Sequence, residues 1–374
     1  MMAKPLVVLA AGGTGGHVFP AEALAAELGN RGYRLALVTD RRGGNLKGRL
    51  AELETHRVRA GGIAGKGLVA RIFSAVEIII GTLQAWFLLR RLKPAVVVGF
   101  GGYASVPTML AAAYSGTKAA IHEQNAVLGR ANRLLASRVE KIATSFEKVL
   151  AIPETSKSNV ITTGMPVRPQ VTLVRDRTYP NLKAEDTINI AVFGGSQGAH
   201  IFSTVVPAAL RLVDVNLRQR IAVTQQSRAE DVEQVQAAYR DLGVEATIST
   251  FFDDVPNRIA DAHIVICRSG ASTIAELTTI GRPAIFVPYI YAVDDHQTQN
   301  AHAVDEVGGG WLIPEGAFTD QVLADRLESL FAIPHMLESA GAAAKAAGKP
   351  DAASRLADMV IGMMPNTSDQ REAA

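Results

Sequence analysis

Short runs of apolar residues alternate along the chain with longer segments of helical periodicity. An apolar run at residues 6–10 is followed by a helical pattern at residues 20–31, and the same order returns before residue 150. Strands that alternate with helices favour βαβ units and parallel sheets, so we predict an α/β fold. The strands predicted in the first half cover residues 6–10, 34–39, 95–99, 119–122 and 141–144.

The alternation stops near residue 164 and later resumes. Gly164, Pro166 and Pro169 precede a polar run to residue 186, which is typical of an interdomain linker. The strands predicted after it cover residues 188–193, 220–224, 245–250, 264–267 and 284–287. We therefore predict two Rossmann-like domains, at residues 1–164 and 165–348, that face a central ligand cleft. Residues 349–374 are assigned to a C-terminal helix that packs back on the first domain and to a frayed tail.

Composition agrees with two globular domains. The 374 residues exceed the ~150 usual for one domain, and 48% of them are hydrophobic. A net charge of +2 without a run of Lys or Arg argues against nucleic acid as a partner. The single cysteine, Cys267, excludes an intramolecular disulfide, and we interpret it as a small buried side chain. The N-terminus does not have the pattern of a signal peptide.

The most apolar stretch is residues 72–89. Glu77 and Gln84 interrupt it, and it is shorter than the ~20 residues that span a bilayer. One helical stripe holds Ile72, Val76, Ile79, Ile80, Leu83 and Phe87, and the flanking basic residues are Arg71, Arg90, Arg91 and Lys93. The pattern alone favours a deeply buried helix. The alternative is a helix that lies on a membrane, with apolar side chains inserted and basic ones facing anionic lipid.

Three glycine loops follow apolar strands, at residues 12–16, 99–102 and 194–198. Glycine lets the backbone approach an anion closely, and the following helix offers free N–H groups and a positive dipole end. A single loop of this kind is more often a tight turn, but three of them indicate phosphate binding. The NAD fingerprint fails because Val18 stands where its third glycine is required, and the P-loop pattern fails at Ala60 and Gly67.

No Asp-x-Asp pair occurs in the sequence, so we predict neither a metal site of that kind nor a required cofactor. If a diphosphate leaves, helix N-termini and hydrogen-bond donors must stabilise its charge.

Polar residues gather behind the strands of the second half. A strand is predicted to end at Cys267 and a helix to begin near Thr273. Glu276 then fits either a capping box with Thr273 or a carboxylate that accepts two hydrogen bonds from a ribose diol. Residues 294–301 supply acidic and amide groups that suit a sugar, or form a solvated loop before a helix. Phe251 and Phe252 either flank a base or close the core.

These motifs, taken in order, resemble those of the MurG family, the N-acetylglucosaminyltransferases of peptidoglycan synthesis. The resemblance extends over residues 4–360, and its specificity lies in the joint order of motifs that are weak individually. The matching segments are residues 12–17, 101–103, 122–125, 194–199 and 268–271 with Glu276, and 295–297 with Asn300.

The resemblance implies a GT-B fold and an inverting transfer. N-acetylglucosamine would pass from UDP-N-acetylglucosamine to the 4-hydroxyl of lipid I, the muramoyl pentapeptide carried on undecaprenyl diphosphate, and the product would be lipid II. This step belongs to cell-wall biogenesis, on which cell shape and division depend. The implied location is peripheral, on the cytoplasmic face of the bacterial inner membrane. The membrane contact would then involve Ile72, Ile79, Leu83 and Trp86.

The resemblance places the donor in the second domain. Glu276 would bind the ribose hydroxyls, while Phe251 and Phe252 would border the uracil. Gln297 and Asn300 would read the sugar, helped by the amide of Ala271. The remaining donor residues would be Gly195, Ser196, Gln197 and Arg268. His200 stands where the family commonly has an arginine, which weakens the expectation of a cation at the diphosphate. Tyr291 stands where the family commonly has a histidine, which weakens the expectation of a contact with the donor sugar.

The first domain would hold lipid I. We predict His17 as the general base, because an imidazole titrates near neutral pH and this one lies beside the first glycine loop. A structural or phosphate-binding role for His17 is the alternative. The other acceptor residues would be Thr14, Gly15, Gly16, Gly101, Gly102, Tyr103, Asn125 and Arg168.

Three other functions compete with this interpretation. A GT-B enzyme that glycosylates another membrane lipid, such as a diacylglycerol, would share the UDP site and the apolar helix. A non-catalytic subunit that binds a sugar nucleotide would need only one of the two sites. An NAD oxidoreductase is disfavoured by Val18.

Overall fold

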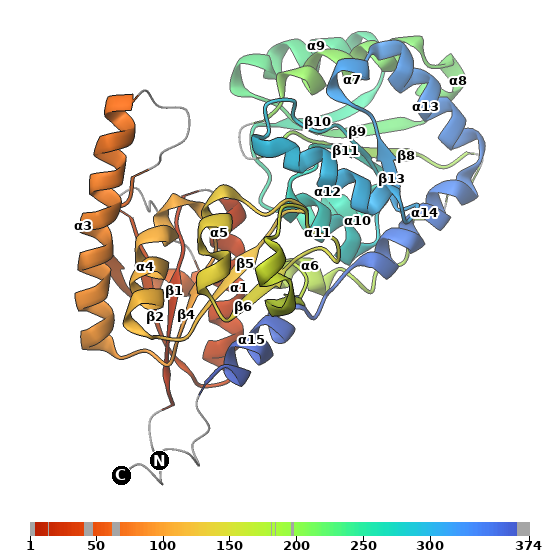
Figure 1. Ribbon diagram of the computed structural model, residues 1–374. Helices are drawn as coiled ribbons and strands as arrows, with labels where there is room; N and C mark the ends of the chain where they lie inside the picture. The colour runs from red at the N-terminus through yellow and green to blue at the C-terminus, as the bar shows by residue number, and fades with distance from the viewer. Residues whose placement is uncertain are drawn as a thin grey trace. The chain divides into compact units, whose positions relative to one another are not determined.

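The computed structural model describes residues 4–13, 15–40, 48–61, 68–180, 182–183, 185–195 and 198–364, with side chains of the helix at 68–92 described from Ile72 onward. Thr14, Ser196 and Gln197, to which the sequence analysis gave roles, lie outside these residues. The chain divides into two compact units, Met1–Arg168 with Asp351–Ala374 and Pro169–Pro350 (Figure 1). Both units are parallel α/β structures, which confirms the predicted fold class.

Within the described residues, the first unit contains a seven-stranded sheet in the order β3-β2-β1-β4-β5-β6-β7. The strands pair in parallel throughout. Their bounds are β1 Leu6–Ala10, β2 Arg34–Thr39, β3 Glu54–Arg57, β4 Val96–Gly99, β5 Ala119–Glu123, β6 Lys141–Thr144 and β7 Val160–Thr162. In such a sheet the carboxyl ends of neighbouring strands share one edge, so the loops after β1, β4 and β5 lie side by side.

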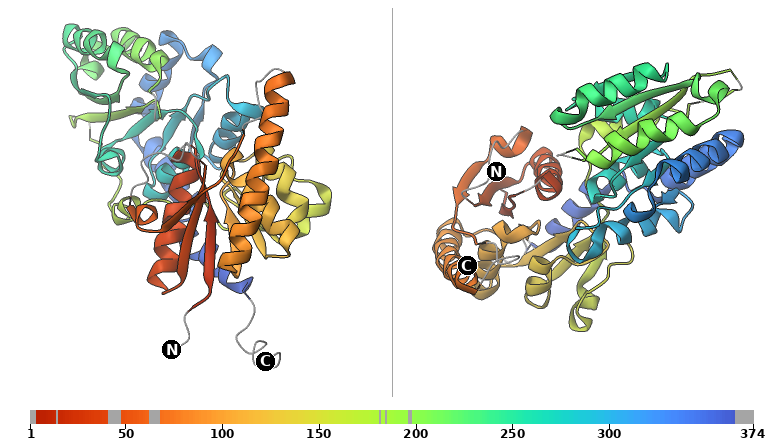
Figure 2. Two further views of the ribbon diagram at one scale, coloured as in Figure 1. Left: turned by 90° about the vertical axis from the view of Figure 1, so that its left-hand side faces the viewer. Right: turned by 90° about the horizontal axis from the view of Figure 1, so that it is seen from above.

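Helices cover both faces of this sheet, because successive side chains of a strand point to opposite sides. In β1, Leu6 and Val8 pack in the cluster that includes α3 and α4, whereas Val7 and Leu9 pack against α1 and α15. Figure 2 shows α3 on the outer side of the first unit. The helices of this unit are α1 Gly15–Asn30, α2 Gly48–Ala51, α3 Leu68–Leu92, α4 Gly102–Ser115, α5 Arg130–Leu135 and α15 Ala352–Gly362.

The C-terminal helix α15 packs on the first unit, as predicted. Leu356 and Val360 are fully buried in the cluster that contains α1. At its margin, Arg31 donates a hydrogen bond to the Ser354 hydroxyl at 2.7 Å and pairs with Asp358. The chain thus leaves the first unit, completes the second, and returns to finish the core of the first.

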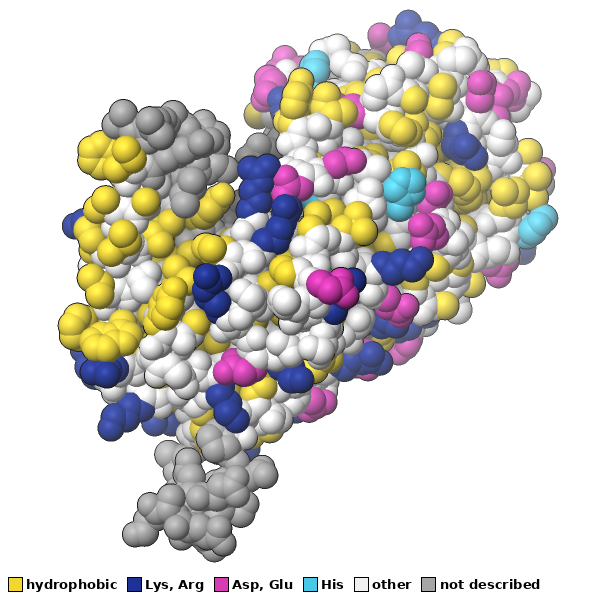
Figure 3. Space-filling model, in the orientation of Figure 1, with side chains coloured by type: hydrophobic (Ala, Val, Ile, Leu, Met, Phe, Trp, Pro, Cys, Tyr) yellow, Lys and Arg dark blue, Asp and Glu magenta, His cyan; other side chains and the backbone are white. Residues whose placement is uncertain are grey.

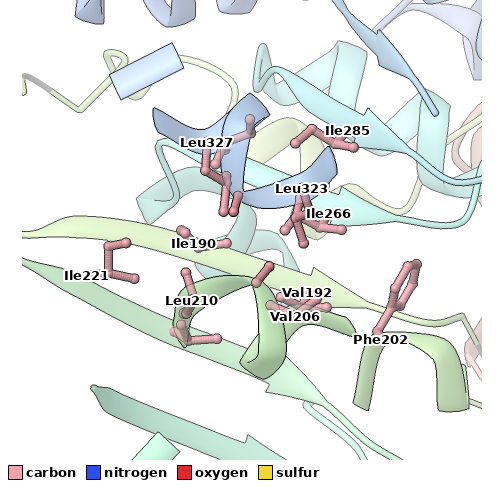
Figure 4. Packing of buried hydrophobic residues seen from close by; sticks show 14 of the residues in the cluster. Ile190, Val192, Phe202, Val206, Leu210, Ile221, Ile266, Ile285, Leu323 and Leu327 are labelled. Carbon is pink, nitrogen blue, oxygen red and sulfur yellow. The ribbon is translucent and has the colours of Figure 1, made fainter. Parts of the chain in front are cut away.

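The second unit contains, among its described residues, a six-stranded parallel sheet in the order β10-β9-β8-β11-β12-β13. Its strands are β8 Ile188–Phe193, β9 Ile221–Gln226, β10 Glu245–Ser249, β11 Ile264–Cys267, β12 Ala284–Phe286 and β13 Gly310–Leu312. Its helices are α6 Pro169–Leu173, α7 His200–Leu212, α8 Val215–Arg218, α9 Val232–Asp241, α10 Val255–Asp261, α11 Ala271–Ile280, α12 His296–Asp305, α13 Asp320–Ala332 and α14 Pro334–Ala347. Figure 4 shows α7 and α13 packing their aliphatic side chains against β8, β9 and β11.

Most of the segment predicted as a linker is bound to the second unit. Arg175 donates a hydrogen bond to the carbonyl of Thr279 at 2.6 Å. Arg282, which is 2% exposed, donates to the carbonyls of Thr178 and Ala260 at 3.0 and 2.7 Å. Burial lowers the pKa of Arg282 to about 10, and the guanidinium stays charged at neutral pH while it ties residues 175–180 to the sheet.

Among the described strands, three escaped prediction: β3, β7 and β13. Each lies at an edge of its sheet and has no more than four residues. Edge strands are covered on fewer sides, and residues of β3 and β7 are exposed or half-buried. They therefore lack the continuous apolar run by which the central strands were recognised.

Candidate active site

The loops that follow β1 and β4 bring two helix N-termini to one edge of the first sheet. Gly15 and Gly16 open α1, and Gly102 opens α4 with Gly101 as its N-cap. Gly101 and Gly102 have φ of 79° and 67°, a left-handed backbone that favours glycine. Free N–H groups at a helix start bind anions, so this edge can hold a phosphate.

His17 lies in the first turn of α1 and is partly buried. Its Nδ1 atom is 3.0 Å from Oε1 of Gln124, beyond the end of β5. Its ring also lies against the second glycine loop, where a Cβ at Gly102 would be 3.2 Å from Cδ2 and 3.4 Å from Nε2. The structure thus brings His17, Gly101 and Gly102 together, although they are more than 80 positions apart in the sequence.

His17 is held by Gln124, which in turn contacts His122. Neither His122 nor Gln124 was among the predicted site residues. Both are buried. His122 Nε2 is 3.1 Å from the carbonyl oxygen of Gly164, and Gln124 Nε2 donates to the carbonyl of Phe100 at 3.0 Å. Burial lowers the pKa of His122 to about 4, so this ring is neutral at neutral pH. The sequence did contain a signal for this pair. His122 and Gln124 are two positions apart, which puts both side chains on one side of an extended segment.

Glu123 organises the loop that follows β5. It is 2% exposed and accepts hydrogen bonds from the backbone N–H of Asn125 at 3.0 Å and of Gly129 at 2.8 Å. The side-chain amide of Asn132 donates to the same carboxylate at 2.7 Å, and that of Asn125 does so at 3.3 Å. Asn125, predicted to contact the acceptor, is therefore also held by the loop itself.

Tyr103 and Arg168 lie at the margins of this edge. Tyr103 is the second residue of α4 and is partly buried. Arg168 has its guanidinium carbon 5.4 Å from the ring centre of Phe19, on α1. Burial raises the pKa of the nearby Glu22 carboxyl, and the charge of Arg168 opposes this effect. Arg168 thus supplies a cation beside the helix that carries His17.

In the second unit, α11 begins earlier than the sequence analysis expected. Gly270 has an extended backbone and is the N-cap, Ala271 is the first helical residue, and Ile274 N–H donates to Gly270 O at 3.0 Å. Thr273 is therefore inside the helix, and the predicted start near Thr273 is wrong. The capping-box interpretation of Glu276 fails with it, because that motif needs Thr273 at the N-cap. Glu276 is a carboxylate of the second turn and is 8% exposed.

Arg268 braces the segment after β12. It donates hydrogen bonds to the carbonyls of Val287 and Pro288 at 3.1 and 3.2 Å and to Glu315 Oε2 at 2.6 Å. The partner Glu315 was not foreseen, since 47 positions separate the two residues. A guanidinium held in this way fixes the backbone of the loop that leads to α12.

Two predicted sugar-binding amides are anchored in the same region. Asn300 is buried and donates to the carbonyl of Ser269 at 3.1 Å. Gln297 accepts a hydrogen bond from the N–H of Tyr289 through Oε1 at 3.0 Å. Both side chains thus hold loops at the carboxyl edge of the second sheet.

Phe251 and Phe252 follow β10 but have different environments. Phe251 is 65% exposed and presents its ring at the end of the strand. Phe252 is 8% exposed, packs edge-on against Phe193 with ring centres 6.4 Å apart, and lies under the guanidinium of Arg258 at 4.2 Å. Of the two alternatives, Phe252 closes the core, whereas Phe251 has a face that a base can stack on.

The third glycine loop precedes α7. Gly195 and Gly198 have φ of 85° and 68°, and a Cβ at Gly194 would lie 2.3 Å from the backbone nitrogen of Ala199. His200 opens the helix, and its Nδ1 is 2.9 Å from Oδ1 of the buried Asp231. Glycine is thus required where the chain folds back closely on the helix start.

Helix α3 leaves many of its apolar side chains exposed, so the deep burial that the sequence pattern alone favoured is wrong. It also extends beyond the predicted 72–89, and Ile72–Leu92 is long and apolar enough to cross a membrane by length and composition alone. Its buried side holds Ala85 and Leu89, and a Cβ at Gly81 would lie 1.9 Å from the carbonyl oxygen of Arg59. Because that side packs in the core of the first unit, we interpret α3 as a surface helix.

The exposed side of α3 carries an apolar surface, which Figure 3 shows as yellow patches with white between them and dark-blue side chains near the lower end of the helix. Its members are Ile72, Phe73, Val76, Ile79, Leu83 and Phe87, exposed by 46–69%. Trp86, predicted to touch the membrane, is partly buried against the core, with the Arg90 guanidinium 3.9 Å from its ring centre. Arg90 and Arg91 are exposed at the helix end.

The part of the chain that the structure describes contains no group of three or more His, Cys, Asp or Glu side chains arranged to hold a metal ion. The Cys267 thiol is buried, and burial raises its pKa. It is therefore a packed side chain and not an activated nucleophile.

Comparison with known proteins defines the class. The glycosyltransferase family 28 N-terminal domain matches residues 7–144, and the glycosyltransferase family 28 C-terminal domain matches residues 189–356. With its two parallel-sheet units, the chain is a glycosyltransferase of the GT-B class. A UDP-GlcNAc 2-epimerase from Neisseria meningitidis bound to UDP-GlcNAc has the same fold, with a TM-score of 0.66 over 96% of this chain and 100% of the other at 14% identity.

Closer relatives specify the family. The chain is 56% identical, over 98% of both chains, to the UDP-N-acetylglucosamine–N-acetylmuramyl-(pentapeptide) pyrophosphoryl-undecaprenol N-acetylglucosamine transferase of Paramagnetospirillum magneticum. It is 54% identical to that of Rhodospirillum rubrum over 98% of this chain and 92% of the other. The crystal structure of Acinetobacter baumannii MurG matches with a TM-score of 0.77 and 29% identity, covering 96% of this chain and 99% of that one. The chain belongs to the MurG family of N-acetylglucosaminyltransferases.

Proposed function

We propose that this enzyme transfers N-acetylglucosamine from UDP-N-acetylglucosamine to the 4-hydroxyl of the muramoyl sugar of lipid I, which gives lipid II. The observation that carries the proposal is the identity of 56% along nearly the whole chain to a relative whose name states both the sugar donor and the lipid-linked acceptor. The glycine loops and helix N-termini in both units support the proposal, since they would supply a phosphate site for each substrate.

The second unit would bind the donor. Glu276 would accept hydrogen bonds from the ribose hydroxyls, and the exposed ring of Phe251 would stack on the uracil. The diphosphate would lie at the start of α7, where backbone N–H groups stabilise the charge that develops on departing UDP. Gln297 would donate from Nε2 to a sugar hydroxyl, and Arg268 would keep the surrounding loop in place through Glu315.

The first unit would bind the diphosphate of lipid I at the starts of α1 and α4, with Arg168 as a nearby cation. His17 would act as general base. The acceptor oxygen bonds to the anomeric carbon as the bond from that carbon to the UDP oxygen breaks. The hydroxyl proton passes to Nε2 of His17, and the electron pair leaves with UDP. Direct displacement converts the α-linked donor into a β-linked product.

We also propose that the enzyme binds the cytoplasmic face of the inner membrane through the exposed surface of α3. Apolar side chains over several turns with arginines at the end suit an interfacial helix on anionic lipid.

Replacing Leu83 with aspartate is expected to weaken binding to vesicles of anionic phospholipid. Burial of one leucine side chain contributes about 1.5–3 kcal/mol, so the partition coefficient should fall roughly tenfold or more. Leu212→Asp is the matched control, because Leu212 is also a helical leucine, 47% exposed against 55% for Leu83, and lies in the second unit. Sedimentation with vesicles measures both. Equal binding by wild type and Leu83→Asp would contradict the assignment.

An acceptor assay tests the proposed substrate. The purified enzyme is given labelled UDP-N-acetylglucosamine with lipid I or with diacylglycerol, and label is expected only in the product from lipid I. Transfer to diacylglycerol alone would favour a different lipid glycosyltransferase. Donor binding without turnover on lipid I would favour a non-catalytic subunit that binds a sugar nucleotide.

A further inference from the structure

We propose that Gln124 is a positioning residue of the transfer reaction. Its side-chain amide holds the imidazole of His17 in the tautomer that carries hydrogen on Nδ1, which leaves the lone pair of Nε2 for the proton of the attacking hydroxyl. The inference rests on the proposed role of His17 as general base and adds the group that prepares it.

The orientation of the Gln124 amide follows from its neighbours. Its Nε2 atom lies 3.0 Å from the carbonyl oxygen of Phe100 and 3.0 Å from that of His122. Carbonyl oxygens only accept hydrogen bonds, so the NH₂ group must face them. A flipped amide would place its oxygen against two other oxygens in a buried site, where repulsion is not screened by water.

The orientation of the amide in turn decides the tautomer of His17. With the NH₂ group facing the carbonyls, Oε1 points to His17 Nδ1 at 3.0 Å. An amide oxygen can only accept, so Nδ1 must carry the hydrogen. In a neutral imidazole the other nitrogen then has the free lone pair, and the tautomer is set by the bond that its partner nitrogen makes.

His122 supports the same arrangement from the other side of the amide. Its Nε2 is 3.1 Å from Gly164 O and must donate to it, which leaves Nδ1 of the neutral ring as an acceptor. This Nδ1 lies 3.1 Å from Gln124 Nε2, whose two hydrogens are therefore shared among three acceptors, this nitrogen and the carbonyls of Phe100 and His122. The donors therefore run in one direction, from His17 Nδ1–H to Gln124 Oε1 and from Gln124 Nε2–H to His122, with Gly164 accepting at the end. Reversal of any one group would oppose two donors or two acceptors.

The free nitrogen of His17 lies where the proposed mechanism needs it. A Cβ at Gly102 would come within 3.4 Å of Nε2, so this atom is at the start of α4, beside the proposed diphosphate site. A base with the opposite tautomer would present an N–H there and would be unable to take a proton. Loss of the correct tautomer is thus expected to lower turnover without affecting the donor site.

The test combines kinetics with ¹⁵N spectroscopy of the histidine rings, in which His17→Gln identifies the His17 signals. Wild type should show protonated Nδ1 and unprotonated Nε2 when the ring is neutral. Gln124→Leu should shift the tautomer toward Nε2–H. It should lower kcat by roughly 10–100-fold, which is less than the full loss expected when a general base is removed. The KM for UDP-N-acetylglucosamine should remain nearly unchanged. Gln124→Glu keeps an oxygen opposite Nδ1, and its buried carboxyl can hold a proton toward the carbonyls of Phe100 and His122, so it should preserve the tautomer and retain more activity than Gln124→Leu.

Gln225→Leu is the matched control. Gln225 is equally buried, accepts a hydrogen bond from Tyr239 at 2.6 Å, and lies in the second unit. Its loss should lower the melting temperature but change neither the His17 tautomer nor kcat. A Gln124→Leu protein that melts earlier with an unchanged tautomer would make Gln124 merely structural and overturn the proposal.

Failure of the inference can be distinguished from failure of the base assignment. If Gln124→Leu leaves both the His17 tautomer and kcat unchanged while His17→Gln is inactive, Gln124 does not position the base, although the base assignment stands. If His17→Gln turns over at the wild-type rate, the base assignment fails, and the reaction role of Gln124 fails with it.

Discussion

The variant His17→Ala is expected to lose roughly 10²–10⁴-fold in kcat, the range typical of a lost general base. The KM for UDP-N-acetylglucosamine should change by less than about twofold. The proposed donor-binding residues belong to the other unit, so the substitution should not weaken binding of the donor. Steady-state kinetics with lipid I measures both constants. The prediction depends on the position of His17 Nε2 beside Gly102 at the start of α4.

His335→Ala is the control for this experiment, since His335 is an exposed histidine on α14. It should leave kcat unchanged. A lower melting temperature of His17→Ala with a normal kcat would make His17 structural. A raised KM for lipid I with a normal kcat would instead make it a phosphate ligand.

The second large effect is expected at Glu276. Glu276→Ala removes the charge-assisted hydrogen bonds to the ribose at a total cost of about 1.5–3 kcal/mol, so the Kd for UDP should rise roughly 10–150-fold. Titration calorimetry with UDP measures this directly. Because α11 begins at Ala271, loss of a helix cap cannot account for such an effect.

Glu328→Ala supplies the comparison for Glu276. Glu328 lies on α13 in the same unit and accepts a hydrogen bond from Asp214 N–H at 2.8 Å. Its replacement should reduce stability and leave the Kd for UDP unchanged. If Glu276→Ala behaved in the same way, Glu276 would serve packing and not the nucleotide.

The central strands could be predicted from sequence because strands buried in a parallel sheet are continuous apolar runs. The glycine loop after the first strand of each half indicated two similar units. Strand β1, with five buried residues, is the clearest case. Edge strands such as β3, with the sequence Glu54–Arg57, leave no such signal because their side chains remain partly in solvent. The start of α11 was misplaced because Thr273 and Glu276 have the spacing of a capping box while Gly270 sets the actual start.

The environment of side chains was harder to predict than the elements themselves. An apolar helix such as α3 has the same composition whether protein or a lipid surface covers it. Which of its side chains are exposed can therefore be seen only in the structure. The contact of His17 with Gln124 depends on the strand order β1-β4-β5, which sequence spacing does not reveal. The pairing of Arg268 with Glu315 depends in the same way on the order of strands in the second sheet.

The most direct test of the central claim is the stoichiometry and stereochemistry of a single incubation with lipid I and labelled UDP-N-acetylglucosamine. We predict that one UDP is released for each labelled lipid formed and that the label is attached to the 4-hydroxyl of the muramoyl sugar in β linkage. Release of UDP without labelled lipid, or a product with α linkage, would contradict the account.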